Sequence, residues 1–96
     1  MFKRRKIKIS GRYLEAFLVK LFGKNLILIK GSRGFVMCGY LDLKAADKFC
    51  DVAVKVTGVS TINDALKASV HSCSSRARRL GIHKGQPLKE ALRIIV

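Results

Sequence analysis

Two residues of the chain combine a reactive side chain with a spacing that could support catalysis: Cys38 and Asp42, with Gly39 between them. A thiolate nucleophile needs a neighbouring base or a positive field that lowers its pKa. The many Lys and Arg residues could supply the field, and His71 or His83 could supply the base. Gly39 would let a ligand approach the backbone closely. Cys38 and Asp42 are therefore the candidate catalytic residues.

A structural interpretation competes with the catalytic one. Free cysteine is among the most often buried residue types. Asp42 directly precedes a helical pattern, where its carboxylate can accept a hydrogen bond from a first-turn amide. Two residues without a third, orienting group do not form a catalytic constellation. We therefore favour a protein without catalysis, in which Cys38, Cys50 and Cys73 are small buried hydrophobic side chains.

The spacing of cysteine and histidine does not fit a metal site. The three cysteines are odd in number and include no Cys-x-x-Cys pair, and His71 and His83 stand far apart. Structural zinc sites use closely spaced ligand pairs. We expect no metal, no cofactor and no disulfide framework.

The charge of the chain is +14, from 20 Lys and Arg against 6 Asp and Glu, and residues 1–33 hold ten of the cations with one acid, Glu15. Such a field attracts nucleic acid and other polyanions, and it could equally serve solubility alone. The strongest candidate patch for a polyanion is Lys3, Arg4, Arg5, Lys6, Lys8 and Arg12. Phe2 and Tyr13 flank this patch and could stack on bases. On an edge strand, the same cations would instead keep sheets from pairing wrongly.

Two smaller basic groups could also hold anions. The turn Gly31-Ser32-Arg33-Gly34 could bind one on its backbone amides, although it has no phosphate-loop pattern and a plain hairpin turn is the simpler interpretation. The second group surrounds the end of a predicted helix: Arg76, Arg78, Arg79, His83 and Lys84. Basic residues stabilise the last turn of a helix in any case, so ordinary solvation explains this group as well.

The first half of the chain has the periodicity of strands. Lys6–Ile9 alternates with period two, which puts Ile7 and Ile9 on one face. Tyr13–Leu21 is apolar on both faces, so both must be covered, and a chain this small indicates self-association as the means. Further strands are expected at Leu26–Lys30, Phe35–Leu41 and Val52–Val56. Short turns between the first four strands make an antiparallel meander the simplest topology.

The second half changes to helical periodicity. Helices are expected at Leu43–Cys50, Ser60–Leu66, Ser72–Leu80 and from Pro87 onward. Asp42 and Thr61 are the expected N-caps. The side chains expected to face the core include Phe49, Cys50, Cys73, Leu80, Leu88, Ala91, Leu92 and Ile95. The fold class is therefore α+β: an N-terminal antiparallel β-meander followed, after the helix at Leu43–Cys50, by a mixed strand and three short helices.

Length and hydropathy fit a single domain over residues 1–96. Its parts are a basic strand at 3–9, an oligomerising sheet region at about 10–41 and a helical part at about 42–96. No stretch approaches the ~20 apolar residues of a membrane-spanning helix. The basic start continues into alternating charged residues, which cannot form the apolar core of a signal peptide. We expect a cytoplasmic protein without a membrane partner.

Two blocks of the sequence resemble the signature of the YunC-like family, a bacterial and archaeal domain of unknown function. The first is Gly34-Phe35-Val36-Met37-Cys38-Gly39-Tyr40-Leu41-Asp42, and the second runs from Gly58 through Leu80-Gly81-Ile82 to Glu90-Ala91-Leu92. The motif positions that this resemblance implies are Gly34, Met37, Cys38, Gly39 and Asp42. It also implies an α+β fold whose N-terminal sheet region mediates tetramerisation, and it implies no biochemical activity.

Three functions remain in view. The first is a homo-oligomeric binding or scaffold domain with no recognisable catalytic machinery and an unknown biochemical function. The second is binding of nucleic acid or another polyanion through the basic N-terminal patch. The third is a small-ligand or cysteine-based enzyme site around Cys38 at a subunit junction.

Overall fold

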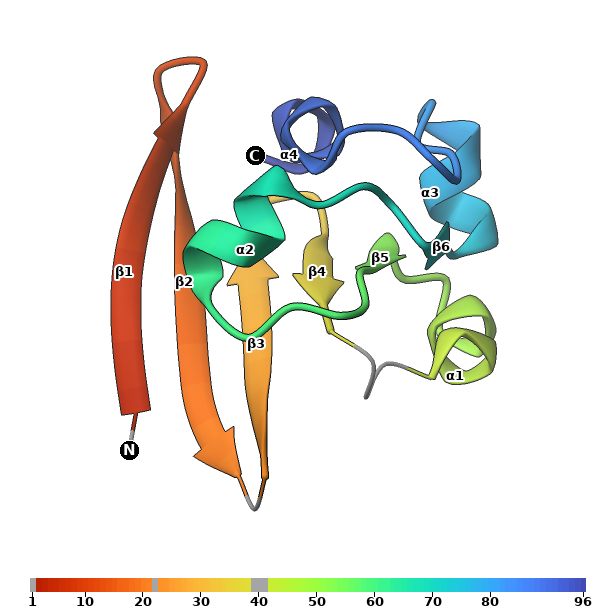
Figure 1. Cartoon of the computed structure of the whole chain (residues 1–96). Helices are drawn as coiled ribbons and strands as arrows, with labels where there is room; N and C mark the ends of the chain where they lie inside the picture. The colour runs from red at the N-terminus through yellow and green to blue at the C-terminus, as the bar shows by residue number, and fades with distance from the viewer. Residues whose placement is uncertain (1, 22, 39–41) are drawn as a thin grey trace.

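The computed structural model describes residues 2–21, 23–38 and 42–96, which fold into one six-stranded sheet and four helices (Figure 1). The strands are β1 (Phe2–Ile9), β2 (Arg12–Leu21), β3 (Lys24–Lys30), β4 (Phe35–Met37), β5 (Ala53–Lys55) and β6 (Ser72–Cys73). The helices are α1 (Leu43–Lys48), α2 (Ile62–Lys67), α3 (Ser75–Arg79) and α4 (Leu88–Ile95). The strands lie side by side in chain order, and the α+β class is confirmed.

Strands β1 to β4 form the predicted antiparallel meander. The β1–β2 hairpin turns through Ser10 and Gly11, whose φ angles are both positive, at 53° and 78°. A two-residue turn of this kind has the twist that a hairpin needs. The predicted fourth strand, Phe35–Leu41, forms β4 over Phe35–Met37, while residues 39–41 lie outside the described part of the chain.

Strand β5 joins the sheet parallel to β4. Parallel neighbours need a crossover connection, and α1 lies between the two strands in the chain. β6 then pairs antiparallel with β5, with Val54 opposite Cys73. Figure 1 shows α1 and α3 beside this end of the sheet, at the side opposite to β1. The basic strand β1 comes first in the strand order and pairs with β2 alone among the described strands, so it is a free edge of the sheet.

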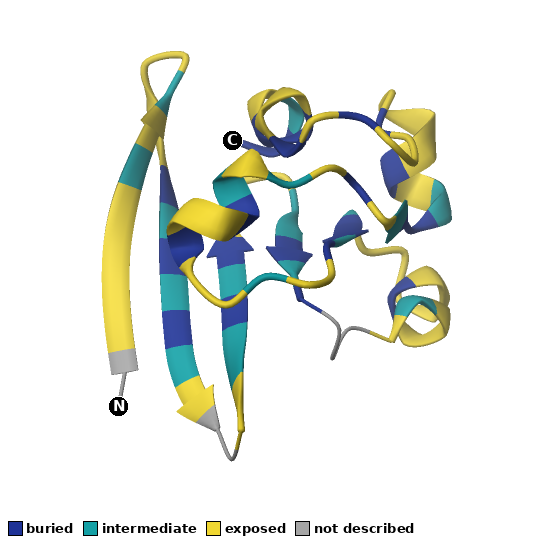
Figure 2. Cartoon of the chain, viewed as in Figure 1, coloured by how far each residue is buried: buried dark blue, intermediate teal, exposed yellow. Residues whose placement is uncertain are grey.

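One face of the sheet carries the hydrophobic core, and we call it the inner face. Helices α2 and α4 pack on it. The buried residues of β2 and β3 on this face are Leu14, Ala16, Leu18, Ile27 and Ile29. The predicted stripe of α4 is fully buried against them: Leu88, Ala91, Leu92 and Ile95. Figure 2 shows the resulting alternation of buried and half-buried residues along β2 and β3.

Three predictions of inward-facing side chains are wrong. Phe49 is 71% exposed and Leu80 is 45% exposed, and Cys50 is exposed as well. Phe49 and Leu80 are the C-cap residues of α1 and α3, and Cys50 has a positive φ of 58° just beyond α1. Helical periodicity does not extend past the end of a helix, so it assigned these side chains to the wrong side.

The predicted helix Ser72–Leu80 is wrong in its first turn, because Ser72–Cys73 form β6 and α3 begins at Ser75. The cause is Ser74, which is fully buried. Its hydroxyl accepts hydrogen bonds from the amides of Ala77 (3.3 Å) and Ala53 (3.0 Å), and it donates to the carbonyl of Asp51 (2.7 Å). One side chain thus caps α3 and fastens it to β5.

The predicted N-caps are confirmed. The Asp42 carboxylate accepts hydrogen bonds from the amides of Lys44 (3.0 Å) and Ala45 (3.4 Å). The Thr61 hydroxyl accepts one from the amide of Asp64 (3.0 Å), whose own carboxylate accepts from the amide of Ser60 (3.3 Å). The reciprocal bond of a capping box therefore reaches one residue further back than usual. None of the helices formed by the described residues is long and apolar enough to cross a membrane.

The contrast between buried Leu92 and exposed Leu80 can be tested with one matched pair of substitutions. We expect Leu92→Ala to lower the free energy of unfolding by about 2–5 kcal/mol, because it leaves a cavity in the core. Leu80→Ala should change it by about 0.5 kcal/mol or less, as surface substitutions usually do. Urea unfolding at one fixed protein concentration measures both. Equal losses for the two variants would contradict the inward orientation of α4.

Candidate functional site

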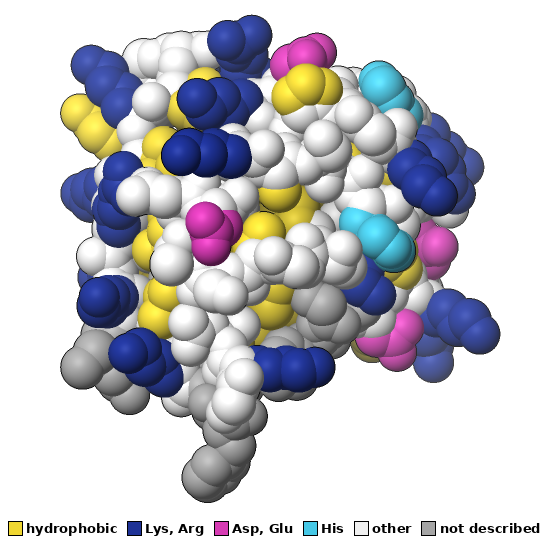
Figure 3. Space-filling view, in the orientation of Figure 1, with side chains coloured by type: hydrophobic (Ala, Val, Ile, Leu, Met, Phe, Trp, Pro, Cys, Tyr) yellow, Lys and Arg dark blue, Asp and Glu magenta, His cyan; other side chains and the backbone are white. Residues whose placement is uncertain are grey.

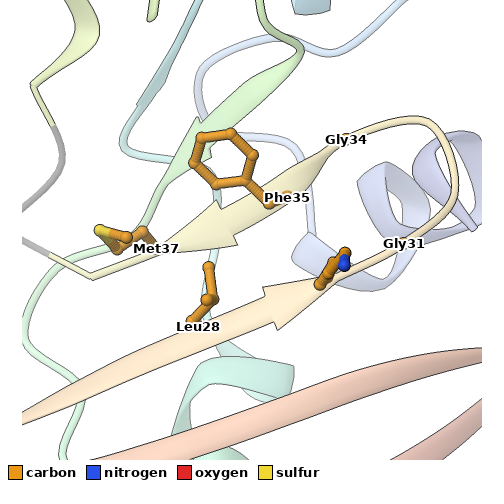
Figure 4. A pocket seen from close by; sticks show the side chains of 6 residues that line it. Leu28, Gly31, Gly34, Phe35 and Met37 are labelled. Atoms are coloured by element: carbon orange, nitrogen blue, oxygen red, sulfur yellow. The ribbon is translucent and has the colours of Figure 1, made fainter.

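The sheet has a second apolar surface on the face opposite the core. Six half-buried side chains of β2, β3 and β4 make up this apolar outer face: Phe17, Val19, Leu26, Leu28, Phe35 and Met37. Two adjoining hollows of about 360 Å³ and about 270 Å³ lie on it, and Leu28 lines both. Figure 4 shows Leu28, Phe35 and Met37 on the same face of β3 and β4.

Strand register brings these side chains together. Val19 lies opposite Leu26, and Leu28 lies opposite Met37. Residues directly opposite each other in antiparallel strands share a face, so the i, i+2 alternation of three strands adds up to one surface. Sequence reasoning found the second face of β2 but missed that β3 and β4 continue it. The signal was present in Leu26 and Leu28 and in Phe35 and Met37, each pair two residues apart.

The rim of the outer face is charged. Toward the free edge, the guanidinium of Arg4 forms an ion pair with the carboxylate of Glu15 at 2.6 Å. Lys30 lies opposite Phe35 within the sheet, and Lys55 lies beside Met37 on β5. Exposed ion pairs contribute at most about 1 kcal/mol, so the free energy available on this face is mainly that of apolar burial.

Cys38 lines a different hollow, of about 480 Å³, together with Asn25 and Ser60. The side chain is only 5% exposed. Its thiol donates to the carbonyl of Asn25 (3.7 Å) and accepts from the amide of Ile27 (3.5 Å). Both partners are backbone groups of β3. The thiol thus extends the pairing of the sheet one position beyond β4, where the Cys38 amide also donates to the Ile27 carbonyl (3.1 Å).

Neither histidine is bonded to this thiol. Nδ1 of His71 lies 3.0 Å from the Ser72 hydroxyl, and Nδ1 of His83 lies 3.1 Å from the Lys84 carbonyl. The Asp42 carboxylate is engaged in capping α1. Among the described residues, therefore, the structure does not assemble the base and orienting group that a cysteine nucleophile needs.

The remaining motif positions have local packing roles. A Cβ on Gly34 would lie 2.6 Å from the Val52 carbonyl oxygen, so no side chain fits there. Met37 lines the larger outer hollow. Gly39 lies outside the described residues. The motif therefore contributes to the outer face through Gly34 and Met37, and to the separate hollow through Cys38.

The other two cysteines differ sharply in environment. Burial raises the pKa of the Cys73 thiol above its ordinary value, and the guanidinium of Arg78 offsets part of this rise. Cys50 is exposed. In residues 2–21, 23–38 and 42–96, no three His, Cys, Asp or Glu side chains gather closely enough to hold a metal ion.

The structure places the basic residues that the sequence suggested for anion binding in three separate regions. Lys3, Arg4, Arg5, Lys6 and Lys8 lie on β1, and Arg12 begins β2 beside them. In the turn of Arg33, the amide of Arg33 donates to Ile95 (2.9 Å) and the amide of Gly31 donates to Gly34 (2.8 Å), so neither is available to an anion. Arg76 and Arg79 are exposed on α3, at the far end of the sheet from β1.

The burial of the three thiols can be tested by reaction with a thiol reagent near neutral pH. We expect Cys50 to react first, and the Cys50→Ser variant to lose this rapid phase. Cys73 should react slowly and accelerate as the pH rises, because a raised pKa lowers its thiolate fraction at neutral pH. Unfolded protein, in which all three thiols are accessible, is the control. Labelling of Cys38 ahead of Cys50 would contradict this order and favour the catalytic interpretation.

Comparison with known proteins agrees with the fold and gives no activity. The model of the family described as "Domain of unknown function (DUF1805)" matches residues 37–95. An uncharacterized protein, YunC of Bacillus subtilis (strain 168), is 34% identical over 90 residues, covering 90% of this chain and 89% of that protein.

A solved structure has the same architecture. The crystal structure of a protein of unknown function from Thermoplasma acidophilum aligns with a TM-score of 0.96 at 36% identity, covering 100% of this chain and 94% of that one. The relatives are themselves uncharacterised. The chain thus belongs to the YunC-like family of domains of unknown function, DUF1805.

Proposed function

We propose that this protein is a homo-oligomeric binding or scaffold domain whose subunits associate through the apolar outer face. The observation that carries the proposal is the row of half-buried side chains on that face, centred on Leu28. The occupant is a second copy of the same chain. Its outer face has the same apolar centre, so the two centres can bury one another.

The contrast between the two faces of the sheet supports the choice of a second copy as the occupant. The inner face of the same strands is filled by α2 and α4, whereas the outer hollows are lined by side chains of β2, β3 and β4 and their turns. Burying apolar surface contributes about 25 cal/mol per Å². A chain of 96 residues gains proportionally more from such burial than a large one, because much of its surface remains exposed.

The resemblance to the YunC-like family favours the same surface. That resemblance implies that the N-terminal sheet region mediates tetramerisation, and the outer face lies in that region, on β2, β3 and β4. A tetramer is therefore the oligomer we propose.

Adjacent residues of β2 offer a sharp test, because Leu18 is buried on the inner face and Val19 lies on the outer face. We expect Val19→Glu to stay folded and to weaken self-association at least about tenfold, which corresponds to 1.4 kcal/mol. Leu18→Glu should unfold the subunit instead, because it buries an unpaired charge. Far-UV circular dichroism reports folding, and analytical ultracentrifugation reports mass. A folded Val19→Glu variant with the wild-type mass would refute the proposal.

Salt provides a second, independent test. Each subunit carries +14, so the subunits repel one another, and screening by salt reduces this repulsion. We expect the mass measured by ultracentrifugation to shift toward the tetramer as salt rises from about 50 mM to about 200 mM. Dissociation with increasing salt would mean that ion pairs, rather than apolar burial, hold the subunits together.

A further inference from the structure

Strand β1 concentrates cations on both of its faces. Five of its eight residues are Lys or Arg. Register with β2 places Arg4, Lys6 and Lys8 on the outer side, opposite Phe17, Glu15 and Tyr13. Lys3 and Arg5 fall on the inner side, opposite Leu18 and Ala16. Because β1 is the edge of the sheet, all five cations border solvent, and Figure 3 shows Lys and Arg side chains along this border of the molecule.

An exposed aromatic ring stands among these cations. Tyr13 is 62% exposed. The ammonium groups of Lys6 and Lys8 lie 6.0 Å and 5.9 Å from the centre of its ring. A ring in this position can stack on a nucleic-acid base while the ammonium groups neutralise the adjoining phosphates. Leu28, the centre of the outer face, lies opposite Phe17, which is four residues along β2 from Tyr13. That separation is roughly 14 Å along the strand, so this platform lies apart from the centre of the outer face.

The inner side of β1 adds two basic hollows. One, of about 500 Å³, is lined by Lys3 and Arg5 against the start of α2, where the Arg5 guanidinium donates to the Asn63 side chain at 2.8 Å. The other, of about 350 Å³, lies beside Ile7 and Ile9, and α4 contributes Lys89 and Arg93 to it. The cations thus continue around the edge onto the helical side.

We propose that β1 and its hairpin with β2 bind single-stranded nucleic acid, with phosphates on the Lys and Arg side chains and a base stacked on Tyr13. Same-face residues of a strand stand about 7 Å apart, a spacing comparable to that of successive phosphates in an extended single strand. A duplex keeps its bases stacked on each other and could use the charges but not the ring.

Two other occupants of this edge fit less well. Pairing β1 with β1 of a second copy would bring rows of like charge together, which is unfavourable. An acidic peptide added as a strand would use the free backbone edge of β1. It would not use Tyr13, whose ring lies on the face of the sheet.

The test is fluorescence anisotropy with a labelled thymidine or uridine homopolymer of about 16 nucleotides, titrated with the complete protein at salt from about 50 mM to about 200 mM. The affinity should fall with salt with a logarithmic slope of about −0.7 for each phosphate neutralised. This is opposite in sign to the salt dependence expected for self-association. The double variant Lys6→Glu/Lys8→Glu should bind at least about tenfold more weakly, with a shallower slope.

Two matched variants separate a defined site from the general charge of the protein. Arg76→Glu/Arg79→Glu on α3 changes the net charge equally and should retain most of the affinity. Tyr13→Ala should lose about tenfold in affinity with an unchanged salt slope, whereas Tyr13→Phe should bind like the wild type. Ultracentrifugation confirms that each variant keeps its mass, so that lost binding is not lost assembly.

The proposal is overturned if the wild type does not bind at about 50 mM salt. It is also overturned if the α3 variant loses as much affinity as the β1 variant, or if Tyr13→Ala binds like the wild type. Equal affinity for a duplex, or equally effective competition by polyglutamate at the same charge concentration, would replace a nucleic-acid strand site with nonspecific attraction of polyanions.

Discussion

The strict alternation of side chains along β2 is the constraint on which the rest of the structure depends. Leu14, Ala16 and Leu18 point to one face of the sheet, and Val19 points to the other. The inner set receives α2 and α4 and becomes the core. The outer set is continued by Leu28 and its neighbours on β3 and β4 and keeps its side chains half-buried. A sheet that is apolar on both faces needs two covering layers, and the proposed second subunit would supply the outer one.

Charge and apolar burial act in opposite directions in this molecule. A net charge of +14 on 96 residues resists self-association, and it also attracts polyanions. The surface for self-association and the surface for polyanions lie in different places, because the apolar side chains gather on the central strands and the cations of β1 lie at the edge. The inner side of β1, and the end of its outer side beside Tyr13, would thus remain accessible beside an interface centred on Leu28. Self-association and polyanion binding are therefore compatible on one subunit.

The motif that carries the family resemblance serves several structural ends. Gly34 permits the close approach of Val52, Met37 lines the outer hollow, and Asp42 caps α1. Cys38 bonds to the backbone of β3 instead of to a catalytic partner among the described residues. Each role is a packing or hydrogen-bonding requirement of the crossover from the meander to α1 and β5, which is where an antiparallel sheet becomes mixed.

The sequence alone determined the features that depend on local order. Period-two alternation predicted the four-stranded meander, the apolar stripe of α4 followed from helical spacing, and Asp42 and Thr61 were recognisable as caps because a cap acts within its own first turn. Tertiary structure decided the rest. The predicted helix Ser72–Leu80 begins only after Ser74, because the Ser74 hydroxyl bonds to β5. Phe49, Cys50 and Leu80 are exposed because they lie where helices end. Strand pairing joined β2, β3 and β4 into one outer face and placed Tyr13 beside Lys6 and Lys8, because residues far apart in sequence meet only once the register is fixed.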